Sequence, residues 1–348
     1  MHLSFRHFTL VLLVLGIAAC HSQKQFVETR DTFQTFGTFV DVTLIDVPKK
    51  SQPAVLKRAK EDLDYMYFAY HAGKAGPIGR TNQLLAAAGE FTANPSLVPL
   101  LIKSQQLARK SHDLFNPAIG KLFKLWGFQD EFPPEGPPPD DAAILALVKS
   151  HPSMSNLSIK GIRINNTSPA VNLDLSGIAK GYAMDFLINN LKAEGINNAM
   201  INADGDLKVL GQHGDHPWHI GIRDPRTSDN IASLDVHDGE AVFTAGDYER
   251  YYDYNGKRYH HILDPRTGYP AKQTRSVTVI NSDAALADAA ATALFVAGPE
   301  QWLTIAKDMG ISQAMLIDAN GAIYMTPQMH QRIKLEKPVN DIKVVALP

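Results

Sequence analysis

The 348-residue sequence contains a single cysteine, Cys20, and few charged side chains. With only one thiol, no disulfide can form within the chain, so the fold must be held together by packing. Charged residues make up 20% of the sequence and leave a formal net charge of −2, which gives no basic field for nucleic acid. Beyond the N-terminal region, no apolar run is long enough to span a bilayer.

Several motifs of common enzyme classes are also missing. The sequence has no His-x-x-x-His pair and no Cys/His cluster, which argues against a zinc site. It has no Gly-x-Ser-x-Gly, which argues against an α/β-hydrolase. Its glycine spacing matches neither Gly-x-Gly-x-x-Gly nor a P-loop, so a Rossmann or NTPase fold is poorly supported.

Residues 1–19 have the pattern of a signal peptide. Arg6 precedes Phe8–Ala19, an apolar run too short to span a membrane. Ile17–Cys20 resembles a bacterial lipobox, in which the cysteine is lipidated and becomes the new N-terminus; an ordinary secretory signal with a chance cysteine is the alternative. We therefore expect a palmitate-bearing lipoprotein anchored at Cys20, with a polar tether over residues 20–34. It would face the periplasm, with the inner membrane preferred as the anchor.

Strand and helix patterns intermix along the rest of the chain. Residues 38–45 alternate apolar and polar side chains as a half-buried strand does, and residues 53–68 carry apolar positions on one helical face. Without strict βαβ alternation, this favours an α+β fold with a large mixed or antiparallel sheet. We expect one domain over residues 35–328 and a C-terminal tail over 329–348. Shorter expected segments are a loop at 71–82, a helix near 96–110, a Pro-rich excursion at 131–141 followed by regular structure at 142–149, a strand at 157–164 and a helix opening at Pro299.

Asp288 and Thr292 lie four residues apart in an Ala-rich segment, so on a helix they share one face. A carboxylate and a hydroxyl offer the hard oxygens that Mg²⁺ prefers. The alternative is structural, because threonines in helices often bond back to a carbonyl and aspartates often cap.

Asp174–Gly181 predicts a strand that runs into a glycine turn and then a helix. Amides at such a helix start can bind phosphate, and Lys180 adds a cation, although glycine turns of this kind are often only structural. His260 and His261 are adjacent, so in a strand they face opposite ways and at most one points into a site.

The order of these segments resembles the ApbE family, the FAD:protein FMN transferases. The resemblance extends from about Thr35 to Met325. The similar segments are Gln34–Val42, Phe115–Gly120, Leu125–Phe128, Asp174–Asp185, Ile201–Asp206, Pro217–Pro225, His261–Gly268 and Ser276–Gly298.

The resemblance implies a T-fold-related architecture of mixed or antiparallel sheets with packed helices, and a FAD cleft between two lobes. It also implies the activity. Members bind FAD and Mg²⁺ and move the FMN half of FAD onto a Ser or Thr of an acceptor flavoprotein, with release of AMP. Many members are anchored to the membrane through an N-terminal lipid.

Carried over by position, the metal ligands would be the side chains of Asp288 and Thr292 and the carbonyl of Gly177. The residues implied to contact FAD are Phe36, Tyr70, Asp113, Leu114, Phe115, Asp174, Lys180, His261 and Ile262. Lys180 and Arg266 could offset phosphate charge. The general base stays open between His261 and an aspartate beside the metal, such as Asp288.

The chain departs from the family pattern at several positions: Asn116, Lys121, Asp204, Ala245 and His260. None of these removes a proposed metal side chain. Two other functions remain open, a Mg²⁺-dependent FAD pyrophosphatase with water as acceptor and a non-catalytic lipoprotein that binds and delivers FAD. A lipoprotein that binds a divalent ion only for structure would leave the glycine turn with Lys180 unexplained.

Overall fold

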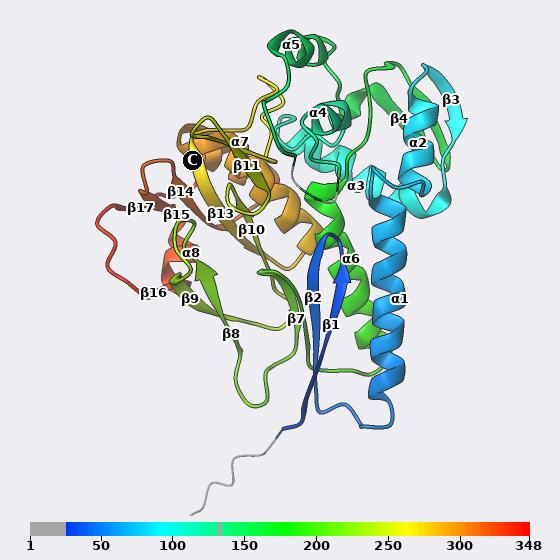
Figure 1. Cartoon of the computed structure of the whole chain (residues 1–348). Helices are drawn as coiled ribbons and strands as arrows, with labels where there is room; N and C mark the ends of the chain where they lie inside the picture. The colour runs from blue at the N-terminus through cyan, green and yellow to red at the C-terminus, as the bar shows by residue number, and fades with distance from the viewer. Residues whose placement is uncertain (1–25, 131, 133) are drawn as a thin grey trace, which may run out of the picture.

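The computed structural model describes residues 26–130, 132 and 134–348 (Figure 1). The predicted signal peptide, Cys20 and the first part of the predicted tether lie outside the described residues. Within the described ranges, no helix is both long and apolar enough to cross a bilayer.

A sheet of nine strands forms the centre of the fold, in the order β1-β2-β6-β7-β10-β13-β14-β15-β17. Neighbouring strands are antiparallel except for the parallel pair β15 and β17. The strands are β1 Glu28–Thr35, β2 Thr38–Ile45, β6 Ala199–Ala203, β7 Asp206–Leu210, β10 Ala241–Gly246, β13 Thr274–Asn281, β14 Gln313–Asp318, β15 Ile323–Met325 and β17 Ile342–Val344. The predicted α+β class with a mixed sheet is therefore confirmed.

Alternation along the strands gives this sheet two apolar faces. In β10, Phe243 belongs to the core with the long helices, whereas its neighbour Val242 belongs to a second core on the opposite face. The first core includes α1 Gln52–Tyr70, α2 Pro77–Leu85, α3 Val98–Lys110, α6 Ser176–Ala193 and α7 Ala284–Met309. The second includes β8 Trp218–Arg223, β9 Asn230–Val236 and α8 Pro327–Arg332. Figure 1 shows α6 beside α1 on the helical side.

Helix α7 is the most deeply buried element of the helical layer. Nearly every residue from Ala284 to Gly298 is buried, and the alanines allow close approach from several sides. Gly298, with φ +68°, interrupts the helical dihedrals immediately before Pro299. The predicted helix start at Pro299 is confirmed as the start of a second helical segment after a kink, because the glycine reaches a conformation that lets the proline begin a new helical segment.

A third, smaller core carries a hairpin at one end of the molecule. It packs β11 Tyr251–Tyr254 and β12 Lys257–His260 against α4 Gly120–Leu125 and α5 Asp141–Lys149. The buried Trp126 anchors it, and its Nε1 donates a hydrogen bond of 2.8 Å to the Gly268 carbonyl. This bond holds the turn after β12 against α4. As expected, the described residues up to Asp140 in the Pro-rich excursion form no helix or strand.

Two terminal predictions were wrong. Residues 28–34 of the expected tether form most of the edge strand β1, which pairs with β2 from Glu28↔Ile45 to Thr35↔Thr38. The expected tail contains β16 Lys334–Leu335, which pairs with β9, and β17, which pairs with β15. Both segments lie at sheet edges with mostly exposed side chains, so hydrophobic periodicity could not reveal them.

Two internal predictions also need correction. The expected loop at 71–82 contains the start of α2, where Pro77 occupies the first turn, a position that suits proline. The expected strand at 157–164 is a hairpin of β4 Leu157–Lys160 and β5 Arg163–Asn166, to which β3 Gly89–Thr92 adds as a third strand. The hairpin turns at Gly161, whose φ of +58° favours glycine.

Candidate active site

A cleft opens where α6 and α7 approach the segment before α4 and the residues on either side of the hairpin β11–β12. Its walls come from several parts of the chain that are distant in sequence. The lining includes Phe36, Tyr67, Tyr70, Leu114, Phe115, Phe128, Gln129, Asp174, Gly177, Lys180, Asp206, Glu249, Arg250, His261, Ile262, Asp288 and Thr292. One region of this lining is aromatic and apolar, and another carries the charged groups of α6, α7 and β7.

The start of α6 is held by Asp174. Its Oδ1 accepts hydrogen bonds from the backbone N–H of Ser176 at 3.0 Å and from the Ser176 hydroxyl at 2.6 Å. Its Oδ2 accepts from Gln129 Nε2 at 3.1 Å, which ties the turn to the far wall of the cleft. The predicted glycine turn is confirmed, with Gly177 outside helical dihedrals at ψ +18°. The strand expected before it forms only an isolated bridge from Asn172 to Ile119.

Asp288 lies against α6 rather than in solvent. Its side chain is buried, and Oδ2 accepts a hydrogen bond of 3.0 Å from the backbone N–H of Gly181. The two helices can meet only because residue 181 is glycine, since a Cβ there would lie 2.2 Å from the Ala284 carbonyl oxygen. Asp288 therefore reaches the cleft at a fixed distance from the glycine turn.

The three predicted metal ligands come together in this cleft. A Cβ built on Gly177 would lie 3.3 Å from Thr292 Oγ1, so the glycine turn and the hydroxyl are direct neighbours, and Asp288 lines the same cleft. Burial and the nearby Asp206 raise the pKa of Asp288 to about 7 although Lys180 opposes them, so a cation here would stabilise its ionised form. In the described part of the chain, no three His, Cys, Asp or Glu side chains gather as a metal site. The donor set of one carboxylate, one hydroxyl and one main-chain carbonyl still fits Mg²⁺, which binds oxygen and keeps several coordination positions for water or substrate.

Lys180 contributes a positive charge to the cleft. Its Nζ forms an ion pair with the buried carboxylate of Asp206. Burial disfavours the charge, but Asp206 and Glu249 outweigh burial and raise the pKa of Lys180. Asp206 is itself fixed by the Thr244 N–H, which donates to its Oδ1 at 2.9 Å.

The two adjacent histidines have separate environments, as predicted. His260 is buried, its Nε2 donates to the Ala271 carbonyl at 2.7 Å, and its ring meets Phe295 edge-on. His261 lines the cleft, and its Nδ1 lies 3.3 Å from the Arg250 carbonyl, which can only accept. Nδ1 therefore carries the proton and Nε2 is left as an acceptor. Burial, Arg250 and His260 lower the pKa of His261 to about 3, so its imidazole is neutral at physiological pH.

Most of the residues expected to contact FAD line the cleft. Phe36 does so from the turn between β1 and β2, where its φ is +53°, and Tyr70 does so from the end of α1. Leu114, Phe115 and Ile262 add apolar surface. Two residues lie elsewhere. The Asp113 carboxylate accepts from the Ser153 hydroxyl at 2.9 Å outside the lining, and Arg266 is paired with Asp264 at 2.8 Å.

The sequence analysis missed several polar groups of the cleft, chiefly Glu249 and Arg250. Arg250 Nη2 donates to the carbonyls of Phe128 at 2.9 Å and Asp130 at 2.8 Å, and so fixes the loop of the far wall. The Glu249 side chain is open to the solvent of the cleft, and its pKa is raised by partial burial and by nearby carboxylates, against the effect of Lys180. Both residues follow Asp247-Tyr248 in a turn without any periodic pattern, so only their position beside a family motif could have signalled them.

Comparisons with known proteins agree with this geometry. Residues 36–345 match the sequence model of the ApbE family. The chain belongs to the ApbE family. It is 39% identical over 307 residues to a FAD:protein FMN transferase of Rhodobacter capsulatus, covering 88% of this chain and 58% of that protein. It is 28% identical to a FAD:protein FMN transferase of Klebsiella pneumoniae (strain 342), covering 87% and 89% of the two chains.

The fold is that of solved ApbE structures. The ApbE protein of Thermotoga maritima superposes with a TM-score of 0.78 at 30% identity, covering 90% of this chain and 100% of that one. The apo form of the Pseudomonas stutzeri flavinyl transferase ApbE gives 0.75 at 29% identity, covering 90% and 99%. This ApbE chain thus spans nearly all of those structures but little more than half of the Rhodobacter relative.

Proposed function

We propose that this ApbE-family chain is a Mg²⁺-dependent FAD:protein FMN transferase. The acceptor is a flavoprotein that presents a Ser or Thr hydroxyl within a flavinylation motif. The hydroxyl oxygen forms a bond to the phosphorus of the FMN half, the bond from that phosphorus to the AMP phosphate breaks, and the hydroxyl proton is lost. The names of the relatives, FAD:protein FMN transferase and flavinyl transferase, support this reaction.

The observation that carries the proposal is the convergence of Gly177, Asp288, Thr292 and Lys180 in one cleft with aromatic walls. Asp288, Thr292 and the Gly177 carbonyl would hold Mg²⁺, which when bound neutralises charge on phosphate oxygens. Such a transfer depends mostly on positioning and on stabilising charge, so few groups need to react themselves.

Other residues of the cleft would bind the phosphates and rings of FAD and accept the hydroxyl proton. Lys180, fixed by Asp206, places a positive charge beside the phosphates, and the amides at the start of α6 add donors. Phe36 and Tyr70 offer ring faces for the planar parts of FAD. We assign the acceptance of the hydroxyl proton to Nε2 of His261, which is neutral and unprotonated at that atom.

The test incubates the full-length protein in detergent with FAD, Mg²⁺ and a flavoprotein domain that carries a candidate Ser or Thr. Mass spectrometry measures FMN on the acceptor, and chromatography measures AMP. Asp288→Asn should reduce both by on the order of 100-fold or more. The Asn side chain can still accept from the Gly181 N–H, so thermal unfolding without Mg²⁺ should change little.

A matched control lies on the same helix. Asp308 is exposed, pairs with His112 at 2.8 Å and does not line the cleft, so Asp308→Asn should keep full transfer. AMP without acceptor modification would identify a FAD pyrophosphatase instead. FAD retained with neither product would identify a carrier that binds and delivers FAD.

We also propose that Cys20 is lipidated and anchors the enzyme to the periplasmic face of a membrane, the inner one by preference. The support is the Ile17–Cys20 sequence and the lack of any other cysteine. Radiolabelled palmitate should be incorporated into the wild-type chain and not into Cys20→Ser. Label in both proteins, or in neither, would contradict the anchor.

A further inference from the structure

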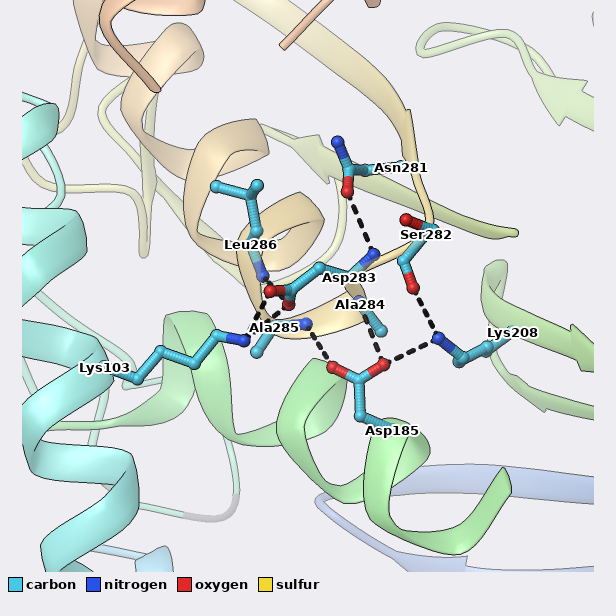
Figure 2. A network of polar contacts seen from close by, with 9 residues as sticks. All are labelled: Lys103, Asp185, Lys208, Asn281, Ser282, Asp283, Ala284, Ala285 and Leu286. Atoms are coloured by element: carbon cyan, nitrogen blue, oxygen red, sulfur yellow. Dashed lines mark hydrogen bonds and ion pairs between the residues drawn. The ribbon is translucent and has the colours of Figure 1, made fainter. Parts of the chain in front are cut away.

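A carboxylate from α6 caps the N-terminus of α7. Asp185 Oδ1 accepts a hydrogen bond of 3.1 Å from the Ala284 N–H, and Oδ2 accepts one of 3.1 Å from the Ala285 N–H (Figure 2). The first N–H groups of a helix have no partner inside the helix, and they carry the positive end of its dipole. Asp185 therefore satisfies two of these donors from a different element.

A buried lysine completes this contact. Lys208 lies on β7, a strand whose residues are all buried, and only 6% of Lys208 is exposed. Its Nζ donates to Asp185 Oδ1 at 2.7 Å and to the Ser282 carbonyl at 2.6 Å (Figure 2). A buried lysine is unfavourable unless it is paired and hydrogen-bonded, and here both conditions are met. Asp185 and Lys208 thus join α6, β7 and the turn before α7.

Asp283 caps the same helix from within. Its Oδ1 accepts from the Leu286 N–H at 2.9 Å, and Lys103 Nζ donates to that oxygen at 2.7 Å (Figure 2). This N-cap stabilises α7 and pairs it with Lys103 of α3, and among the hydrogen bonds of the described residues none joins Asp283 to α6. The two aspartates therefore stabilise one helix end in different ways, and only Asp185 links α7 to α6.

The link continues along the two helices. Gly181 and Asp185 are four residues apart on α6, so they share one face. Gly181 contacts Asp288, and one turn further along α6 Asp185 contacts Ala284 and Ala285. Gly177, one turn in the other direction, neighbours Thr292. Successive turns of α6 thus meet successive turns of α7 in antiparallel order.

We propose that Asp185, held by Lys208, is a positioning residue for the metal site, and this inference rests on the proposed function of that site. The hydrogen bond from Gly181 to Asp288 fixes one point of contact between the two helices. The second attachment at Asp185 fixes the rotation and the axial position of α7. It thereby sets where Asp288 and Thr292 stand relative to the Gly177 carbonyl.

The test measures metal binding directly, using Mn²⁺ as a paramagnetic substitute for Mg²⁺. Full-length wild-type, Asp185→Asn and Asp283→Asn proteins in detergent with FAD are titrated with Mn²⁺, and free Mn²⁺ is followed by electron paramagnetic resonance. Outer partners of metal ligands typically change affinity by about 10–100-fold. We expect Asp185→Asn to weaken Mn²⁺ binding by about tenfold or more, and Asp283→Asn by less than about threefold. Near-UV circular dichroism identifies a temperature at which all three are folded.

Equal weakening in both variants would overturn the inference, because helix stability alone would then explain the effect. No weakening in Asp185→Asn would also overturn it. If Asp185→Asn does not fold, Lys208→Met gives the answer, since it removes the lysine that orients Asp185 and should weaken Mn²⁺ binding in the same direction. Unchanged binding in Lys208→Met would then be the contradicting result.

The experiment separates this inference from the proposed reaction. Wild-type protein that binds Mn²⁺ but transfers no FMN would contradict the proposed function and leave the role of Asp185 testable by affinity. If the wild-type protein transfers FMN and Asp185→Asn binds Mn²⁺ as tightly as the wild type, the proposed function would stand and the role of Asp185 would be contradicted.

Discussion

The backbone N–H of Gly181 donates a hydrogen bond of 3.0 Å to the carboxylate of Asp288, and at this point α6 and α7 are in direct contact. Gly181→Ala would place a methyl group 2.2 Å from the Ala284 carbonyl oxygen. The helices must then separate, and we expect a loss of about 1–3 kcal/mol in the free energy of unfolding, as for other overpacked sites. Urea denaturation measures the loss, and FMN transfer should fall with it.

Gly177→Ala provides the comparison. Gly177 has a negative φ, and its added Cβ would lie 3.3 Å from Thr292 Oγ1 and 3.5 Å from the Phe115 ring. We expect the free energy of unfolding to stay within about 1 kcal/mol of wild type, since alanine can adopt the negative φ of this position. Transfer should require more Mg²⁺, because Thr292 is displaced. Equal destabilisation by both substitutions would contradict this account of the helix contact.

The ion pair of Lys180 and Asp206 should affect both the stability of the fold and the binding of FAD. A double variant separates the two effects. Lys180→Met leaves the carboxylate of Asp206 buried without its partner, which costs about 3–5 kcal/mol in comparable pairs. Lys180→Met with Asp206→Asn removes both charges and should recover most of that stability. The KM for FAD should stay raised in both variants, because both lack the ammonium group of Lys180 beside the diphosphate.

Thermal unfolding and steady-state kinetics on the same preparations decide the outcome. A double variant that regains wild-type KM together with its stability would show that Lys180 acts only through the fold.

Local sequence patterns predicted the parts of the fold that bury one regular face. The strand at 38–45 and the glycine turn before α6 are found where apolar alternation and Gly177 placed them. The edge strands β1 and β17 were not predicted, because they pair through backbone groups and bury few side chains. The hairpin at 157–166 was read as one strand, because the turn at Gly161 is short.

The candidate site was predictable to the extent that it rests on family motifs. The position of Gly177 next to Thr292 follows from no local pattern, and only the resemblance implied it. Asp113 was carried over by position, but its carboxylate accepts a hydrogen bond from the Ser153 hydroxyl outside the cleft lining, although Leu114 and Phe115 next to it line the cleft. Glu249 and Arg250 were missed, since single polar residues in a turn resemble ordinary surface residues.

The contact between Glu240 and Arg332 predicts a dependence of stability on pH. Arg332 donates to Glu240 through Nη1 at 2.6 Å and Nη2 at 2.8 Å, and so attaches α8 to the turn before β10. Burial alone would raise the pKa of Glu240, but hydrogen bonds from Arg332 and from the His237 N–H outweigh burial and lower it. A lowered folded-state pKa stabilises the protein above the unfolded value near 4.5, and the contribution disappears as pH falls through the folded value.

Glu240→Gln should therefore destabilise the protein by about 1.5 kcal/mol at pH 7, near the lower end for hydrogen bonds to charged groups because the carboxylate is partly solvated. At pH 3, below the unfolded value, the unfolded chain already binds a proton at this side chain, so the contribution is partly lost and the gap should shrink. Urea denaturation at both pH values gives the two differences. An equal gap at pH 7 and pH 3 would mean that the charge of Glu240 contributes nothing.

Substitution by alanine should have different effects at the two adjacent histidines, His260 and His261. His260→Ala removes the bond to the Ala271 carbonyl and leaves a cavity against Phe295, so we expect a loss of about 2–4 kcal/mol in unfolding free energy. The His261 side chain lines the cleft, so His261→Ala should change the free energy of unfolding little. FMN transfer should fall by on the order of 100-fold, because the proton acceptor is lost. Because burial lowers the pKa of His261 to about 3, wild-type transfer should show no acidic limb near pH 6.5 from this residue. A limb near pH 6.5 that His261→Ala abolishes would mean that the imidazole gains its proton within the working range, and its assignment as a neutral acceptor would then be wrong.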